Sequence, residues 1–382
     1  MLFYTALTNF LLLSSISYCF DFYLMNQPTK LLLFLLIAVF FFTSCEKPVK
    51  TGYPQFSYDD FRTKSIAGYK IKHLDSLVQG IDICVIPEKN LLLILEIRDK
   101  YYIKAYDLVT LKYLKAFINK GAGLNQQLSC RSIQYMDGFL YSSDTHKKKI
   151  FIYNTDDIVK PGAAVLPVDE ININSKFFYR PLVLPQGMAL QFHQIAQDKK
   201  TSVFDYFDKS GAFLYSKGGY PQLGKRVDFD NLSYAYMGSM NLSNDHRQIM
   251  VDYFNTDILE LYDIQGNLIN RLQGPDQLFP EIKSEAVYGG SMPHLSKDSH
   301  RAYTGKVKSL DGEFYVLYSG KIATDPDIHT DKLFSFNGSL QPKYYFKLPV
   351  PIFAFDIDTK SGVIYGLSTK IKSGNLISYN LK

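Results

Sequence analysis

The stretch ILELYDIQGNLINRL, residues 258–272, carries the pattern from which the fold can be read. An alternating apolar strand ends in Tyr262 and Asp263, a turn passes through Gly266, and a second strand follows. Asp and Gly suit such a turn because both tolerate positive φ, and Asp also hydrogen-bonds to the nearby backbone. The stretch therefore predicts a β-hairpin whose first strand ends in an aromatic residue.

The same hairpin ending recurs along the chain as an aromatic residue followed by Asp or Asn. Successive aromatics lie 47, 54, 55, 74 and 43 residues apart, and a four-stranded propeller blade requires roughly 40–50 residues. We therefore predict an all-β, six-bladed β-propeller, with room for an insertion between residues 274 and 300. A pair of β-sandwiches is the alternative, but sandwiches do not repeat one hairpin ending at this period. The six pairs are Tyr106-Asp107, Tyr153-Asn154, Phe207-Asp208, Tyr262-Asp263, Phe336-Asn337 and Tyr379-Asn380.

The last hairpin ends at Lys382, so closure of the ring requires a strand from the beginning of the fold. SIAGYKIKHL, residues 65–74, is a strand candidate. We expect it to pair in one sheet with the strand near residues 375–381, because closure removes the exposed edges of an open array. The propeller domain is thus predicted to span residues 65–382.

The segment LLLFLLIAVFFFTSCEKPVK, residues 31–50, predicts export. Its run of 12 apolar residues is shorter than the roughly 20 needed to span a bilayer, and it matches the apolar region of a secretory signal. Small residues directly before Cys45 resemble the cleavage site of bacterial lipoprotein signals, in which the cysteine is acylated. An ordinary membrane anchor or a buried core helix is the alternative. The predicted segments are an upstream extension over residues 1–24, a signal peptide from Met25 to residue 44, and a lipidated tether over residues 45–64.

Composition restricts the partners of the chain. Its 42 Lys and Arg are scattered and nearly balance 37 Asp and Glu, which argues against nucleic acid as a partner. The 29 Tyr and 28 Phe favour strands. Of the four cysteines, only Cys84 and Cys130 fall in the predicted propeller. A disulfide between them is allowed outside the cytoplasm, but two buried small apolar side chains are the favoured interpretation.

Four stretches carry a family resemblance: FINKGAGLNQQLSCRSIQ (117–134), RAYTGKVKSLDGEFYVLYSGK (301–321), LFSFNGSLQPKYYFKLP (333–349) and IFAFDIDTKSGVIYGLS (352–368). Together with the signal, they resemble the TolB-like six-bladed propeller lipoproteins of Gram-negative bacteria. The resemblance implies a lipid-anchored propeller in the cell envelope, and that family has no established biochemical function. The glycine-rich loop at residues 121–125 departs from the family because it lacks Pro and Glu after its second glycine.

A binding or scaffold module is the function that we expect, with an envelope protein or a small molecule as the partner. Propeller loops form a rigid rim, and Tyr and Arg are enriched at protein interfaces. Solvated loop residues without a role are the alternative. The acidic run that resembles a surface-export signal is missing after Cys45, which favours a periplasm-facing location. The candidate binding residues are Arg131, Tyr141, Asp144, His146, His294, His300, Arg301 and Tyr303.

A metal-dependent hydrolase or lyase is the alternative function. Propellers that hydrolyse lactones or esters hold a metal in the central channel with carboxylate and Asn ligands, an oxygen site that suits Ca²⁺. We otherwise expect no cofactor, because the same residue types serve tight hairpins. The seven dispersed histidines match no zinc motif, and no nucleophile elbow is present. The candidate calcium ligands are Glu96, Asp144, Asn255 and Asp356.

Overall fold

The chain is described by a computed structural model that divides it into two compact units, Met1–Lys50 and Thr51–Lys382. The described residues are 52–66, 68–74, 76–173, 178–191, 202–221, 231–287, 290–371 and 375–381. The predictions for the upstream extension, the signal peptide and Cys45 lie outside these residues. Within the described ranges, we find no helix with the length and apolar character needed to cross a bilayer.

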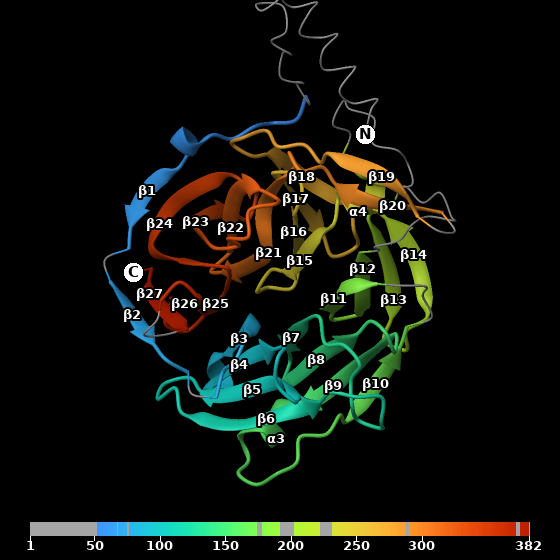
Figure 1. Ribbon diagram of the computed structural model, residues 1–382, viewed down its shortest axis with the longest axis vertical. Helices are drawn as coiled ribbons and strands as arrows, with labels where there is room; N and C mark the ends of the chain where they lie inside the picture. The colour runs from blue at the N-terminus through green and yellow to red at the C-terminus, as the bar shows by residue number, and fades with distance from the viewer. Residues whose placement is uncertain are drawn as a thin grey trace, which may run out of the picture. The chain divides into compact units, whose positions relative to one another are not determined.

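The second unit is a ring of antiparallel sheets, and its described strands form six blades, as predicted (Figure 1). Blade 1 contains β3 (Gly80–Ile86), β4 (Leu91–Glu96), β5 (Tyr101–Asp107) and β6 (Tyr113–Asn119). Blade 2 contains β7 (Ile133–Met136), β8 (Phe139–Asp144), β9 (Lys149–Asn154) and β10 (Asp169–Asn172). Blade 3 contains β11 (Tyr179–Leu184), β12 (Gly187–Gln191), β13 (Phe204–Asp208) and β14 (Phe213–Lys217). Blade 4 contains β15 (Gly238–Leu242), β16 (Gln248–Tyr253), β17 (Ile258–Asp263) and β18 (Leu268–Gln273).

The last two blades take strands from both ends of the unit. Blade 5 contains β21 (His300–Leu310), β22 (Glu313–Ile322), β23 (Thr330–Asn337), β24 (Pro342–Ile352) and the parallel strand β1 (Arg62–Ser65). Blade 6 contains β25 (Ala354–Asp358), β26 (Val363–Leu367), β27 (Leu376–Asn380) and β2 (Tyr69–Lys72). Tyr69 pairs antiparallel with Tyr379, which confirms the predicted closure. The remaining elements are the hairpin β19 (Ile282–Val287) and β20 (Gly290–Leu295), in the predicted insertion, and the short helices η1 (Tyr58–Asp60), η2 (Pro87–Lys89), α3 (Thr155–Val159) and α4 (Leu232–Ala235).

The six aromatic residues that mark the repeats all lie on the third strand of a blade, and all are buried. In blades 1 to 5 the residue after the aromatic ends the third strand, and the connection to the fourth strand follows it. In blade 6, Asn380 ends β27, and the fourth strand, β2, comes from the beginning of the unit. In blade 4, Asp263 accepts hydrogen bonds from Gln265 N (3.0 Å) and Asn267 N (2.8 Å), and Gly266 adopts a φ of 85°. In blades 1, 3, 4 and 5 the motif is therefore a turn signal joined to a core anchor, as the sequence indicates. In blade 2 it precedes helix α3 instead of a tight turn, and in blade 6 it ends the last strand.

Strand direction divides the ring into two ends. Gly80 at the start of β3 pairs with Glu96 at the end of β4, and Ile86 pairs with Leu91 at the opposite end. One end carries the connections from blade to blade and the connections from second to third strands. We call it the loop end. The end with the other hairpin turns is the turn end. Core side chains fill the space between blades, so that Leu93 of β4 and Leu140 of β8 belong to one buried cluster.

The prediction of a tether over residues 45–64 is wrong for the part that the structure describes. Gln273 N donates to Pro54 O (2.9 Å), and Phe56 N donates to Gln273 O (3.0 Å). Phe56 and Phe61 are buried against blade 5, where the ring of Phe61 stacks on that of Phe334 at 4.7 Å. The reason is that burial of the large aromatic side chains stabilises the folded position of this segment. This stabilisation exceeds the tendency of its Pro and charged residues to remain in water.

Candidate functional site: the central cavity

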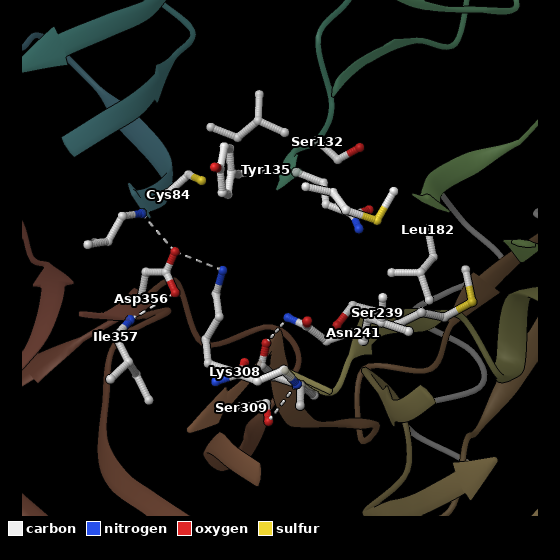
Figure 2. A pocket seen from close by; sticks show the side chains of 18 of the residues that line it. Cys84, Ser132, Tyr135, Leu182, Ser239, Asn241, Lys308, Ser309, Asp356 and Ile357 are labelled. Carbon is white, nitrogen blue, oxygen red and sulfur yellow. Dashed lines mark hydrogen bonds and ion pairs between the residues drawn. The ribbon is translucent and has the colours of Figure 1, made fainter. Parts of the chain in front are cut away.

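The first strands of the six blades surround one cavity of about 390 Å³ on the axis of the ring (Figures 1 and 2). Every blade contributes to its wall, which combines charged, amide, hydroxyl and apolar side chains. Ligand sites commonly have volumes of roughly 300–1,000 Å³. One residue from each blade in turn is Cys84, Tyr135, Leu182, Asn241, Lys308 and Asp356.

Side chains of the cavity wall join neighbouring blades. Gln134 of β7 donates from Nε2 to Val183 O (2.9 Å) and accepts at Oε1 from Val183 N (2.8 Å), which connects blades 2 and 3. The Asn241 amide donates to Val307 O and connects blades 4 and 5. These bonds satisfy polar groups that face the axis and hold the first strands in place. The cavity is therefore formed before any ligand binds.

An ion pair occupies one side of the cavity. Lys308 Nζ lies 3.2 Å from Asp356 Oδ2, and the two side chains are 21% and 12% exposed. Figure 2 shows the Lys308 amine directed toward the cavity, beside the carboxylate that also accepts from Val85 N (2.9 Å). Burial lowers the pKa of Lys308, but the carboxylates of Asp356 and Asp82 raise it, and the net shift is upward. The cavity thus presents a protonated amine at neutral pH.

A second group of charged residues lies between blades 3, 4 and 5. Arg180 donates from a guanidinium nitrogen to Gly305 O (2.9 Å), and its charge lies 5.7 Å from the centre of the Phe254 ring. Behind it, the Ser239 hydroxyl donates to the buried carboxylate of Asp252. Burial raises the pKa of Asp252 to about 6, against the lowering effect of the Ser239 hydrogen bond and Arg180. Of this group, Arg180 and Ser239 line the cavity and Asp252 does not, so this side presents a guanidinium group and a hydroxyl to a ligand.

The cavity cysteine is not an activated nucleophile. Cys84 and Cys130 are both buried and free, which agrees with the interpretation favoured from composition. Burial raises the pKa of the Cys84 thiol well above its usual value, so that it stays neutral. The arrangement can therefore orient a ligand by hydrogen bonds and charge, but it offers no thiolate for covalent chemistry.

The structure does not gather the eight predicted binding residues at the cavity, and none of them lines its wall. Asp144 is buried and accepts from Leu128 N (2.6 Å) and His146 N (3.0 Å), so it orders a turn at the loop end. Tyr303 is buried and donates to Asp257 O (3.0 Å). The others are exposed or half-buried: Arg131 and His146 in loops, Tyr141 on β8, His294 on β20, and His300 and Arg301 on β21.

Of the four candidate calcium ligands, only Asp356 lines the cavity. Glu96 is buried and accepts from Val78 N and Arg98 N (2.8 and 2.9 Å), and Asn255 donates to Tyr234 O (3.1 Å). Asp144 serves its own turn in the same way. Among the described residues, no three His, Cys, Asp or Glu side chains form a group that could hold a metal ion. Sequence reasoning missed the cavity residues Arg180, Asn241 and Lys308, because a single polar residue on a strand gives no site signal by itself.

Fold and cavity together define the class of the protein: a six-bladed β-propeller with a polar central cavity. No model of a known protein family matches the chain, and no curated protein matches it. Among solved structures, it is similar to a member of the DUF4221 family from Bacteroides vulgatus, with a TM-score of 0.52, 11% identity, and coverage of 83% of this chain and 97% of that chain. It is also similar to a protein described as exported from Bacteroides fragilis, with a TM-score of 0.53, 11% identity, and coverage of 84% and 99%. At such low identity these similarities show the fold alone.

Proposed function

We propose that this chain is a binding module of the cell envelope that holds a small polar ligand in the central cavity. The observation that carries this proposal is the convergence of all six first strands on a cavity of about 390 Å³ that contains the Lys308–Asp356 pair. A preformed cavity with few convergent polar groups is typical of small-molecule sites. The ligand would pair a carboxylate, hydroxyl or amide group with the Lys308 amine.

The proposed location is outside the cytoplasm, with the chain anchored to a membrane through acylated Cys45 and facing the periplasm. The apolar run over residues 31–42 supports export, and one similar structure belongs to a protein described as exported. In the second form of the proposal, the module is a scaffold that binds another protein of the cell envelope. In either form the module acts without a metal or cofactor, and a calcium-dependent hydrolase or lyase remains the alternative.

A thermal-shift screen of the purified protein tests the proposal. The panel contains small carboxylates, polyols, amides and amines, and a true ligand raises the melting temperature in proportion to the logarithm of its concentration at saturation. The variant Lys308→Met should lose that shift, whereas Lys297→Met, at an exposed turn, should keep it. A ligand whose shift survives Lys308→Met would place binding outside the cavity and contradict the proposal.

A further inference from the structure

The loop end of blade 1 and the connection to blade 2 expose four aliphatic side chains. The exposed fraction is 91% for Leu124, 66% for Val78, 48% for Leu128 and 39% for Ile97. Ile97 N donates to Gln79 O (3.2 Å), which joins the two segments that carry Val78 and Ile97. Apolar side chains exposed to this degree in neighbouring loops are a feature of surfaces that meet a membrane or a partner.

Lysine side chains connect the loops that carry these aliphatic side chains through hydrogen bonds. Lys120 Nζ donates to Ile97 O (2.6 Å), which ties the connection between blades to the β4–β5 turn. Lys147 Nζ donates to Gly123 O (3.0 Å) and Gln126 O (2.7 Å), on both sides of Leu124. Leu124 therefore lies in a loop whose backbone is held by hydrogen bonds on both sides. The role of the glycine-rich segment 121–125 is then to present Leu124 at the surface.

Basic residues lie in the same loops as the aliphatic tips. Asp99, the acid of the β4–β5 turn, is paired with Lys104 at 2.7 Å, and the hydrogen bond from Lys104 lowers its pKa. At the turn end, the repeated turns place acids such as Asp107 and Asp208 next to lysines such as Lys112 and Lys209. We call the aliphatic and basic group the loop-end patch. Its basic members are Arg98, Lys100, Lys120, Arg131, Lys147 and Lys148.

We infer that the loop-end patch binds the anionic surface of a lipid bilayer. Aliphatic tips surrounded by Lys and Arg match the boundary between acyl chains and anionic headgroups, where each basic residue adds electrostatic attraction. An acidic protein would satisfy the charges, but it would leave the protruding Leu124 without an apolar environment of its own. The bilayer satisfies both features.

The entry point of the chain supports the same orientation. Pro54 and Phe56 are bonded to Gln273, the last residue of β18, which lies at the loop end. Cys45 precedes Gly52 by seven residues, and such a segment reaches at most about 25 Å when fully extended. This step rests on the proposed acylation of Cys45. An anchor and a basic patch at one end of the ring would together hold that end against the membrane.

The orientation has a consequence for the cavity. Its wall includes Glu88, Asn244 and Thr359, which follow the first strands of their blades at the turn end. With the loop end on the bilayer, this side of the cavity faces away from the membrane. A ligand dissolved in the surrounding compartment would then reach the cavity without crossing the membrane surface.

Vesicle sedimentation tests the inference with the chain from residue 46 to residue 382, which lacks Cys45 and contains every strand of the closed ring. We expect about tenfold tighter binding to phosphatidylcholine vesicles with 30% phosphatidylglycerol than to phosphatidylcholine alone, with a loss at high salt. The patch variant is Leu124→Ser with Lys148→Glu. The matched control is Val109→Ser with Lys112→Glu, an exposed pair on a turn-end hairpin of blade 1.

The patch variant should lose most of the preference for anionic vesicles, and the control should keep it. Both variants should melt like the parent chain, because the changed side chains are exposed. Equal vesicle binding by both variants would overturn the inference. Binding to polyglutamate without binding to vesicles would assign the patch to an acidic protein and would also overturn it. Since the tested chain lacks Cys45, neither result bears on the acylation proposal.

Discussion

Lys308 of blade 5 and Asp356 of blade 6 form an ion pair 3.2 Å apart in the wall of the central cavity. The Asp356 carboxylate also accepts from Val85 N of blade 1, so that one side chain connects three blades. Each of these contacts crosses between sheets. The pair is therefore positioned to stabilise the ring as well as to meet a ligand.

Coupling between these two side chains should be measurable by a double-mutant cycle. The variants are Lys308→Met, Asp356→Asn and the double variant, compared by chemical unfolding. We expect a coupling energy of about 1–2 kcal/mol, because both groups are largely withdrawn from water. Additive losses in the double variant would show that the pair contributes no mutual stabilisation.

The stability of the ring should depend on pH through Asp252. Burial raises its folded-state pKa to about 6, while the unfolded carboxyl titrates near 3.9. The native state then holds the proton more tightly between about pH 4 and 6, so this contribution to stability declines as pH rises through that window and is constant above it. Relative to Asp252→Asn, the free energy of unfolding should fall by up to about 3 kcal/mol from pH 4 to pH 7 in urea titrations. A pH-independent difference would contradict the assignment.

The segment before β1 should be part of the cooperative unit. Phe56 is buried against Phe334 and Phe336, with ring centroids 5.9 and 5.3 Å apart, so Phe56→Ala should cost about 3 kcal/mol of unfolding free energy. The matched change Phe139→Ala, at a partly exposed position, should cost less. Thermal melts of both variants measure the difference. Equal losses would mean that the segment contributes little to the ring.

Calcium should leave the melting temperature unchanged. Glu96 and Asp144 already bind backbone N–H groups, and Asp356 is paired with Lys308, which repels a cation. Tight binding would raise the melting temperature by linkage, by several degrees at millimolar calcium. Melts with added Ca²⁺ and with EDTA make the comparison. A clear rise with Ca²⁺ would favour the hydrolase or lyase alternative.

Acylation of Cys45 should be required for membrane attachment. In the precursor, Cys45→Ser should release the protein from membranes or leave it unprocessed, whereas Cys130→Ser should change neither location nor processing. Stable anchoring needs more than one acyl chain, which suits the multiply acylated end of this signal type. Fractionation and intact mass of the two variants provide the readout. Normal processing and membrane attachment of Cys45→Ser would refute the proposed anchor.

Local sequence was enough to predict the hairpins of blades 1, 3, 4 and 5, the number of blades and the closing strand. Asp263 and Gly266 act within their own turn, so neighbouring residues specify that hairpin. The aromatic anchor is different, because Tyr262 is buried against Phe204 of blade 3, with ring centroids 4.8 Å apart. Because the motif occurs once in each blade, the number of motifs then gives the number of blades. The tether prediction failed because it assigned to the tether whatever lay between Cys45 and the closing strand. It overlooked Phe56 and Phe61, whose burial depends on blade 5.

The cavity, by contrast, could not be predicted from any stretch of the chain. Lys308 and Asp356 stand on different blades, and neither has a neighbour in sequence that marks it as part of a site. Glu96, Asp144 and Asn255 looked like ligands because strand ends favour such residues, but backbone hydrogen bonds at those ends use them. Hairpins depend on contacts between residues close in the chain, whereas the cavity exists only where six distant strands converge on one axis.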